Sequence, residues 1–203
     1  ATALIVLAHP FVAIPSSMLV VCYVILLYVL SDKQSRPHFI RSALLSGFTA
    51  LALSSFFWLP SMIERKYTLV DTILLRELAS YAIHFVYPQQ LLFSPWGFGG
   101  SVQGLGDGLS FQINKPYLAI IVVTVAMWIL IRNALKQRID TRVAAMTLFV
   151  ASMMMVSLFL MLPYSKFVWD HIPYLQYLQF PWRFMAFFGL FASIISGSII
   201  YLI

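Results

Sequence analysis

The stretch "VAAMTLFVASMMMVSLFLML", residues 143–162, decides the fold of this chain, because it is long, apolar and free of charged side chains. A helix rises about 1.5 Å per residue, so a stretch of this length crosses the ~30 Å hydrocarbon core of a bilayer. The whole chain has the same character, being 61% hydrophobic and 10% charged over 203 residues. A soluble domain of this size needs a charged surface that so few ionisable residues cannot supply. The sequence therefore indicates an integral membrane protein.

Other stretches share this length and polarity. The sequence predicts an all-α, polytopic transmembrane helix bundle with about five spans, at 11–30, 43–60, 116–134, 143–162 and 184–203. Residues 1–9 are expected to be the end of a truncated sixth span, since they are apolar and lack both an initiator Met and a basic leader. Residues 1–203 are expected to form a single transmembrane domain that is a fragment of a larger protein.

The distribution of basic residues predicts the orientation. The short loops 31–42 and 132–142 together hold seven Lys and Arg residues, which by the positive-inside rule places both loops in the cytoplasm of a bacterial or archaeal cell. Loops 61–115 and 163–183 then face outward. The net charge of +6 is divided among loops and does not form one basic face, so no nucleic-acid partner is expected.

The long outer loop is predicted to contain structure. Ser61 and Glu64 have the spacing of a capping box, which predicts that a helix begins there. In the stretch 69–87, Thr72, Arg76, Ser80 and His84 recur every fourth residue, which is typical of an amphipathic helix. Such a helix either lies in the outer interface or packs on the spans with one wet face.

The next stretch, "FSPWGFGGSVQGLGDGLSFQINKPY" at 93–117, is rich in glycine and predicts a structured loop. Its carboxylate, Asp107, can bind a sugar hydroxyl or a divalent cation, or it can form an Asp-Gly turn. No lysine of the phosphate-loop type follows, so a nucleotide-binding loop is rejected. Three histidines of the predicted outer side, His9, His84 and His171, lack a recognised zinc-ligand spacing, so no metal site is predicted.

Four stretches carry a family resemblance: "AHP" at 8–10, "LSSFFWLPSMIERKY" at 53–67, "SPWGFGGSVQGLGDGLSFQI" at 94–113 and "LQFPWRF" at 178–184. Together they resemble the membrane proteins named 6-pyruvoyl-tetrahydropterin synthase-related, which are polytopic and similar to GT-C type glycosyltransferases. The resemblance implies transfer of a sugar from a polyprenyl-phosphate carrier to an envelope acceptor on the outer face. It also implies that the principal catalytic carboxylate lies in an earlier outer loop, upstream of Ala1.

Arg183 is the main candidate for binding the donor phosphate, because arginine presents a planar, permanently charged fork and the flanking rings can pack on an isoprenoid chain. The alternative is a snorkelling arginine that anchors a helix end to lipid headgroups. Arg65 and Lys66 are further phosphate-binding candidates, or else solvated loop charges.

Two carboxylates are candidates for catalysis, Asp107 and Glu64, although capping alone explains Glu64. Contacts with lipid or sugar are assigned to Trp182, Trp96, His84 and His9, and His9 before Pro10 is also expected at a helix break that faces a polar cavity. The predicted partners are a polyprenyl-phosphate-linked sugar and membrane lipids. A divalent cation is the one cofactor considered.

Two other classes of function remain open. A transporter or flippase of a lipid-linked precursor needs ionisable or unwound elements near the span centres, whereas the charges here are concentrated in loops. A non-catalytic assembly subunit is also compatible with the large outer loop.

Overall fold

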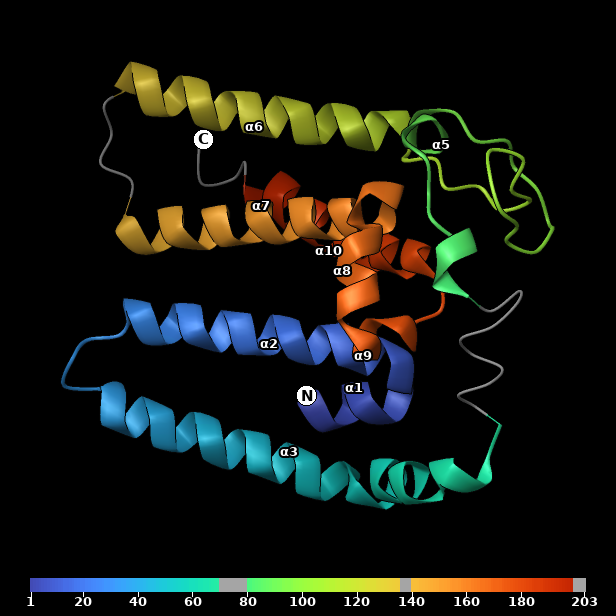
Figure 1. The fold of residues 1–203 in the computed structure, drawn as a ribbon. Coiled ribbons are helices and arrows are strands. Elements are labelled where there is room, and N and C mark those ends of the chain that lie inside the picture. Colours follow the sequence, from blue (N-terminus) through green and yellow to red (C-terminus); the bar gives the residue numbers. More distant parts are fainter. Residues whose placement is uncertain (70–79, 136–139, 199–203) are drawn as a thin grey trace. The chain divides into compact units, whose positions relative to one another are not determined.

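The computed structural model describes residues 1–69, 80–135 and 140–198, with only the backbone of 131–135, and these parts are helical or irregular without any strand (Figure 1). The predicted all-α class is confirmed for these residues. The chain divides into two compact units, each described by itself. Unit 1 is Ala1–Glu77 with Pro173–Leu178, and unit 2 is Leu78–Ile172 with Gln179–Ile203.

Unit 1 is a set of helices folded back on one another (Figure 1). Its elements are α1 (Thr2–Ala8), α2 (Pro10–Leu30), α3 (Arg36–Glu64), η1 (Arg65–Tyr67) and α9 (Pro173–Gln176). The predicted helix break at His9 is present, since this residue has an extended backbone between α1 and α2. Its Nδ1 atom accepts a hydrogen bond from the Val12 N–H at 3.3 Å. His9 is exposed and caps α2, and its predicted place at a polar cavity stays a prediction.

The prediction that a helix begins at Ser61 is wrong. Helix α3 runs without interruption from Arg36 to Glu64 and contains Pro60 in its interior. The Ser61 hydroxyl donates to the Phe57 carbonyl at 2.9 Å, as in a helix interior, and so it is not available as an N-cap. Proline removes one backbone donor, and apolar membrane helices tolerate that loss.

Unit 2 is organised around its last helix. Its elements are η3 (Tyr81–Ile83), α5 (Pro88–Leu92), α6 (Lys115–Leu135), α7 (Thr141–Met161), η4 (Pro163–Ser165), α8 (Lys166–His171), η5 (Pro181–Arg183) and α10 (Phe184–Gly197). Helix α10 packs on both α7 and α6. One face of it is buried with helical spacing, at Phe184, Phe187, Phe188, Phe191, Ala192 and Ile195. The aromatic side chains of α10 therefore form much of the core of this unit.

The amphipathic helix predicted over 69–87 is not observed in the part of this stretch that is described. Residues 81–83 form a single 3₁₀ turn, and the Val86 N–H then donates to the Met161 carbonyl at the end of α7. Phe85 and Val86 are both buried, because the chain here is pinned against the core. The predicted helical positions Thr72 and Arg76 lie outside the described residues.

Three helices of the described chain are long and apolar enough to cross a membrane, which corrects the prediction of about five. They are Pro10–Leu30, Arg36–Tyr67 and Thr141–Met161. The side chains of α6 are described as far as Leu130, and the described α10 is 14 residues long, so neither helix is counted among these three. The candidate spans expose large apolar side chains, such as Phe48 of α3 at 72% and Leu148 of α7 at 70%. Three candidate spans with such apolar surfaces indicate an integral membrane protein.

Candidate functional site

The turn that carries Arg183 is shaped by its own sequence. Gln179 adopts a left-handed backbone with φ of 63°, which is costly for a residue with a side chain. Pro181 then starts the 3₁₀ turn η5, and the Arg183 N–H donates to the Phe180 carbonyl at 3.0 Å. The left-handed backbone at Gln179 and the turn η5 together fix the positions of Phe180, Trp182 and Arg183 immediately before α10.

Arg183 lies on an aromatic platform. Its Cζ atom is 5.0 Å from the centre of the Phe180 ring, and Phe180 stacks on Trp182 with centroids 5.3 Å apart. Trp182 also contacts Phe111 from the glycine-rich loop, at 6.2 Å. A guanidinium over an aromatic face gains cation–π attraction while its edge stays directed at other groups. The arrangement holds a cation in a fixed place beside the helix end.

Partial burial changes the electrostatics of this cation. Desolvation lowers the pKa of Arg183 below its ordinary value. Arginine starts so high that the group stays charged near neutral pH. A charged group that has lost part of its water attracts an anion more strongly than a solvated one, since the local dielectric constant is lower. Arg183 is therefore suited to binding a phosphate.

A polar network adjoins the platform through His84. The Ser101 hydroxyl donates to Asp107 Oδ2 at 2.9 Å, and His84 Nδ1 lies 2.9 Å from the same hydroxyl. Since the only Ser101 proton is directed at the carboxylate, His84 Nδ1 is assigned as the donor to Ser101. The Leu109 N–H donates to Asp107 Oδ1 at 2.9 Å. This loop network of His84, Ser101 and Asp107 positions the histidine ring.

The loop network and the platform meet at one contact. The His84 and Phe180 rings pack edge to face with centroids 4.7 Å apart. Asp107 and His84 are 5% and 3% exposed, so both ends of the polar network are buried. The structure thus brings together four of the residues predicted from sequence, namely His84, Asp107, Trp182 and Arg183, in what we call the Arg183 cluster.

Asp107 has a structural explanation in addition to its predicted roles. Its bond from the Leu109 N–H is the Asp-Gly type of turn that was one of its predicted alternatives. The second oxygen accepts from Ser101, so both oxygens are engaged inside the loop. Sequence reasoning missed Ser101 and Phe180, which link Asp107 to Arg183 and carry no motif of their own.

Trp96 lies apart from this cluster in its contacts. Its ring packs edge to face on Phe98 at 6.2 Å, and both side chains are exposed, Phe98 at 95%. A predicted contact of Trp96 with lipid or sugar stays a prediction. The exposed pair gives the glycine-rich loop an apolar tip.

Unit 1 contains the remaining candidates. Glu64 is the last residue of α3 and is exposed. Arg65 follows it, with its guanidinium 4.8 Å from the Tyr177 ring centre and hydrogen-bonded to the Tyr177 hydroxyl. Lys66 lies 4.9 Å above the Tyr67 ring. These side chains are held by neighbouring tyrosines within unit 1, and the Arg183 cluster belongs to unit 2.

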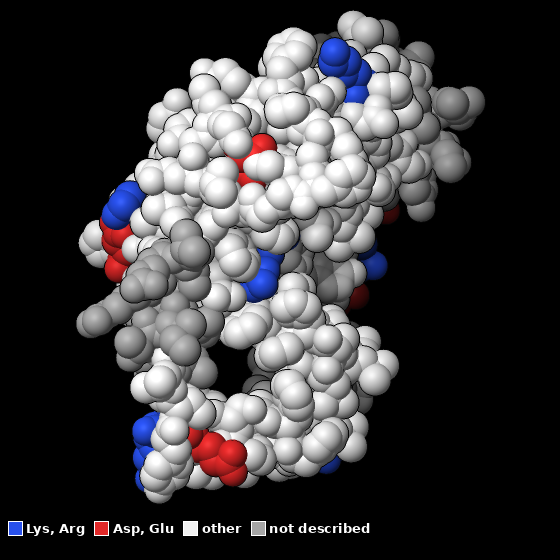
Figure 2. Space-filling model, turned by 90° about the vertical axis from the view of Figure 1, so that its right-hand side faces the viewer, with Lys and Arg blue, Asp and Glu red and all other residues white. Residues whose placement is uncertain are grey.

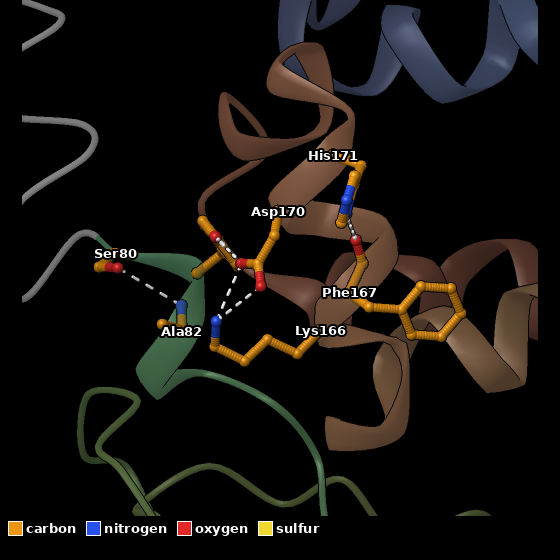
Figure 3. A network of polar contacts seen from close by, with 7 residues as sticks. Ser80, Ala82, Lys166, Phe167, Asp170 and His171 are labelled. Atoms are coloured by element: carbon orange, nitrogen blue, oxygen red, sulfur yellow. Dashed lines mark hydrogen bonds and ion pairs between the residues drawn. The ribbon is translucent and has the colours of Figure 1, made fainter.

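A second polar network in unit 2 was not predicted. Figure 3 shows Lys166 and Asp170 facing each other along α8, with Nζ to carboxylate oxygen distances of 2.9 and 2.8 Å. The Tyr81 hydroxyl donates to the same carboxylate at 2.5 Å. The i, i+4 spacing of Lys166 and Asp170 was a readable signal for the ion pair, but nothing in the sequence pointed to Tyr81.

This second network, formed by Tyr81, Lys166 and Asp170, shifts the pKa values of Tyr81 and Asp170. Burial, and then the hydrogen bond to Asp170, raise the pKa of Tyr81 to about 12. The hydrogen bonds from Lys166 and Tyr81 lower the pKa of Asp170 below its usual value. The Tyr81 ring also stacks on the buried Trp169 at 5.5 Å, so this network fastens η3 to α8.

Charged side chains are few on the face that Figure 2 shows, and in places a basic side chain lies directly against an acidic one. Within the described residues, no three His, Cys, Asp or Glu side chains are grouped so as to hold a metal ion.

No family model, curated protein or solved structure matches this chain.

Proposed function

We propose that this protein binds a polyprenyl-phosphate-linked sugar at the Arg183 cluster and presents it for transfer of the sugar to an envelope acceptor on the outer face of the membrane. The observation that carries the proposal is the half-buried guanidinium of Arg183 on the Phe180–Trp182 stack. The membrane-spanning helices and the resemblance to GT-C type proteins support the same class of function.

Each part of such a donor has a matching group. The phosphate carries the charge that Arg183 attracts, and the isoprenoid chain can pack on the aromatic and apolar side chains around the start of α10. In sugar transfer the acceptor oxygen bonds to the anomeric carbon while the bond to the phosphate oxygen breaks. Negative charge then collects on the departing phosphate, where a fixed cation stabilises it most.

Asp107 and His84 take a positioning role in this proposal. Both Asp107 oxygens accept hydrogen bonds within the loop, and His84 supports the ring on which Arg183 rests. Asp107 therefore acts through His84 and Phe180 on Arg183, and it is not proposed as the base that takes the acceptor proton.

The test is native mass spectrometry of the full chain in mild detergent with an added polyprenyl monophosphate. Arg183→Gln is expected to raise the Kd for this lipid about tenfold, which corresponds to ~1.4 kcal/mol, and so to lower the bound fraction. Arg183→Lys is expected to keep part of the binding, because it retains the charge but loses the fork.

Arg36→Gln is the matched control, since Arg36 also lies 5.0 Å from a ring centre, that of Tyr28, but in unit 1 and near the start of α3. It should bind the lipid as wild type does. Equal retention by wild type and Arg183→Gln would overturn the donor site and make Arg183 an interfacial anchor.

A further inference from the structure

A cavity lies at the other end of α10 from the Arg183 cluster. It is a partly open cavity of about 360 Å³ in unit 2, where α7 begins and α10 ends, and α6 contributes to its wall. The side chains on which the argument depends are Trp128, Arg142, Met146, Val150, Ile194 and Ser198. Helix α10 has 14 residues, so about 21 Å of helix separates this cavity from η5. The two sites are therefore distinct.

The walls of this cavity offer little to a polar ligand. The Thr147 hydroxyl donates to the Val143 carbonyl at 2.9 Å, and the Ser198 hydroxyl donates to the Ile195 carbonyl at 2.6 Å. Trp128 Nε1 in turn donates to Ser198 Oγ at 3.0 Å. These polar groups are already paired, so the surface that remains is hydrocarbon from Met, Val and Ile side chains. Such a cavity suits an acyl chain.

Arg142 supplies a charge at the edge of this apolar space. It is an exposed residue in the first turn of α7, and within the described residues its guanidinium makes no ion pair or hydrogen bond. The neighbouring Asp140 carboxylate accepts from the Arg142 backbone N–H at 2.8 Å and so serves as the cap of α7.

We propose that this cavity binds an anionic membrane phospholipid, with the phosphate on Arg142 and one acyl chain between Met146, Val150 and Ile194. The charge complementarity selects this occupant, because one cation borders an otherwise apolar space at the end of a helix long enough to span the bilayer. The surrounding membrane supplies such lipids at high local concentration. The site does not depend on the proposed sugar-donor function.

The experiment reconstitutes the full chain with equal amounts of phosphatidylglycerol and phosphatidylcholine and then counts retained lipids by native mass spectrometry. Wild type is expected to retain phosphatidylglycerol preferentially. Arg142→Gln should abolish that preference. Gly197→Leu should lower retention of both lipids, because Gly197 lines the cavity and a Cβ there meets no atom within 4 Å, so the new side chain enters the open space.

Arg183→Gln and Arg36→Gln serve as controls and should keep the preference of wild type. Far-UV circular dichroism and thermal unfolding establish that each variant is folded. The proposal is overturned if folded Arg142→Gln keeps the full preference for phosphatidylglycerol, or if Arg36→Gln loses it equally, since the effect would then follow total charge. Loss of polyprenyl-phosphate binding in Arg183→Gln with an unchanged phosphatidylglycerol preference separates the two sites.

Discussion

Tyr81 shows how a single hydroxyl group can join two segments that are far apart in the sequence. Its phenol donates to Asp170, which Lys166 also holds, and its ring stacks on the fully buried Trp169. The charge-assisted bond requires a neutral phenol and an ionised carboxylate at once. Its stability contribution should therefore depend on pH in a direction that the two titrations fix.

We expect wild type to lose stability as the pH rises from 10 toward 12. The pKa of Tyr81 is 10.0 when unperturbed and about 12 in the folded protein, so the folded state disfavours the phenolate. The stabilising effect is complete below pH 10 and disappears as the pH passes through the folded value. Tyr81→Phe should have a free energy of unfolding ~1 kcal/mol lower than wild type near neutral pH. Its stability should not fall further between pH 10 and 12 through this group. Thermal unfolding followed by tryptophan fluorescence over this pH range measures both.

Tyr164→Phe is the control for the Tyr81 variant, because Tyr164 is 69% exposed. It should follow the wild-type profile at every pH. If Tyr81→Phe shows the same alkaline loss as wild type, the Asp170 bond does not stabilise the fold. On the acid side the lowered pKa of Asp170 predicts the opposite sign, with stability lost as the pH falls through its folded pKa.

At the residue scale, the sequence drew attention to Arg183 but did not show which residues hold it in place. The position of Arg183 between Trp182 and Phe184 was readable, because arginine at the mouth of an apolar stretch is conspicuous. Its support by His84 was not readable, since it depends on Phe180, Ser101 and a left-handed Gln179. Left-handed positions are predicted from glycine or asparagine, and glutamine gives no such signal.

Two glycines decide whether the glycine-rich loop can close at all. A Cβ on Gly97 would lie 2.5 Å from the Gly108 carbonyl oxygen, and one on Gly108 would lie 2.9 Å from the Gly99 Cα. These are backbone atoms that cannot rotate away. The loop therefore folds on itself by backbone contact, and Asp107 lies next to that contact.

Gly97→Ala is expected to destabilise the loop by about 1–3 kcal/mol, because the new methyl group would push the backbone at residue 97 away from Gly108. Polyprenyl-phosphate retention should fall with it, since the displaced Asp107 no longer orders His84. Gly100→Ala is the matched control, because a Cβ there has open space around it and the change should be close to neutral. Thermal unfolding and native mass spectrometry of both variants measure stability and lipid retention. Equal values for the two alanine variants would show that the contact between Gly97 and Gly108 does not hold the loop together.

At the element scale, composition predicted helices well and boundaries poorly. The spans 11–30 and 143–162 correspond within a residue or two to α2 and α7, since proline or a capping aspartate marks their starts. Helix α3 begins seven residues before the predicted 43 and passes Pro60 and Ser61, because lipid-facing helices tolerate polar and proline residues that end helices in water. The helical prediction was wrong for residues 80–87, because Phe85 and Val86 are buried against the core from an irregular backbone.

At the scale of the whole molecule, the open question is how many helices cross the bilayer. Three described helices meet the length and hydropathy that a span needs, whereas the positive-inside argument used five. Helix α6 decides between these counts. Its 21 backbone residues extend about 31 Å, enough to cross if the whole helix is embedded. If it does cross, the glycine-rich loop before it and the start of α7 after it lie on opposite sides.

Cysteine labelling tests this directly, because Cys22 is the only native cysteine and Cys22→Ala gives a clean background. We expect Gly100→Cys to react with an impermeant maleimide in intact cells, and Lys33→Cys and Thr141→Cys to react only after permeabilisation. All three positions are exposed, so burial does not limit the reaction. Labelling of both Gly100→Cys and Thr141→Cys from outside would show that α6 does not cross. In that case the Arg142 cavity, at the start of α7, would lie on the outer side and not on the cytoplasmic side that the basic loop residues predict. The Arg183 cluster, which contains Asp107 of the glycine-rich loop, would stay on the outer side.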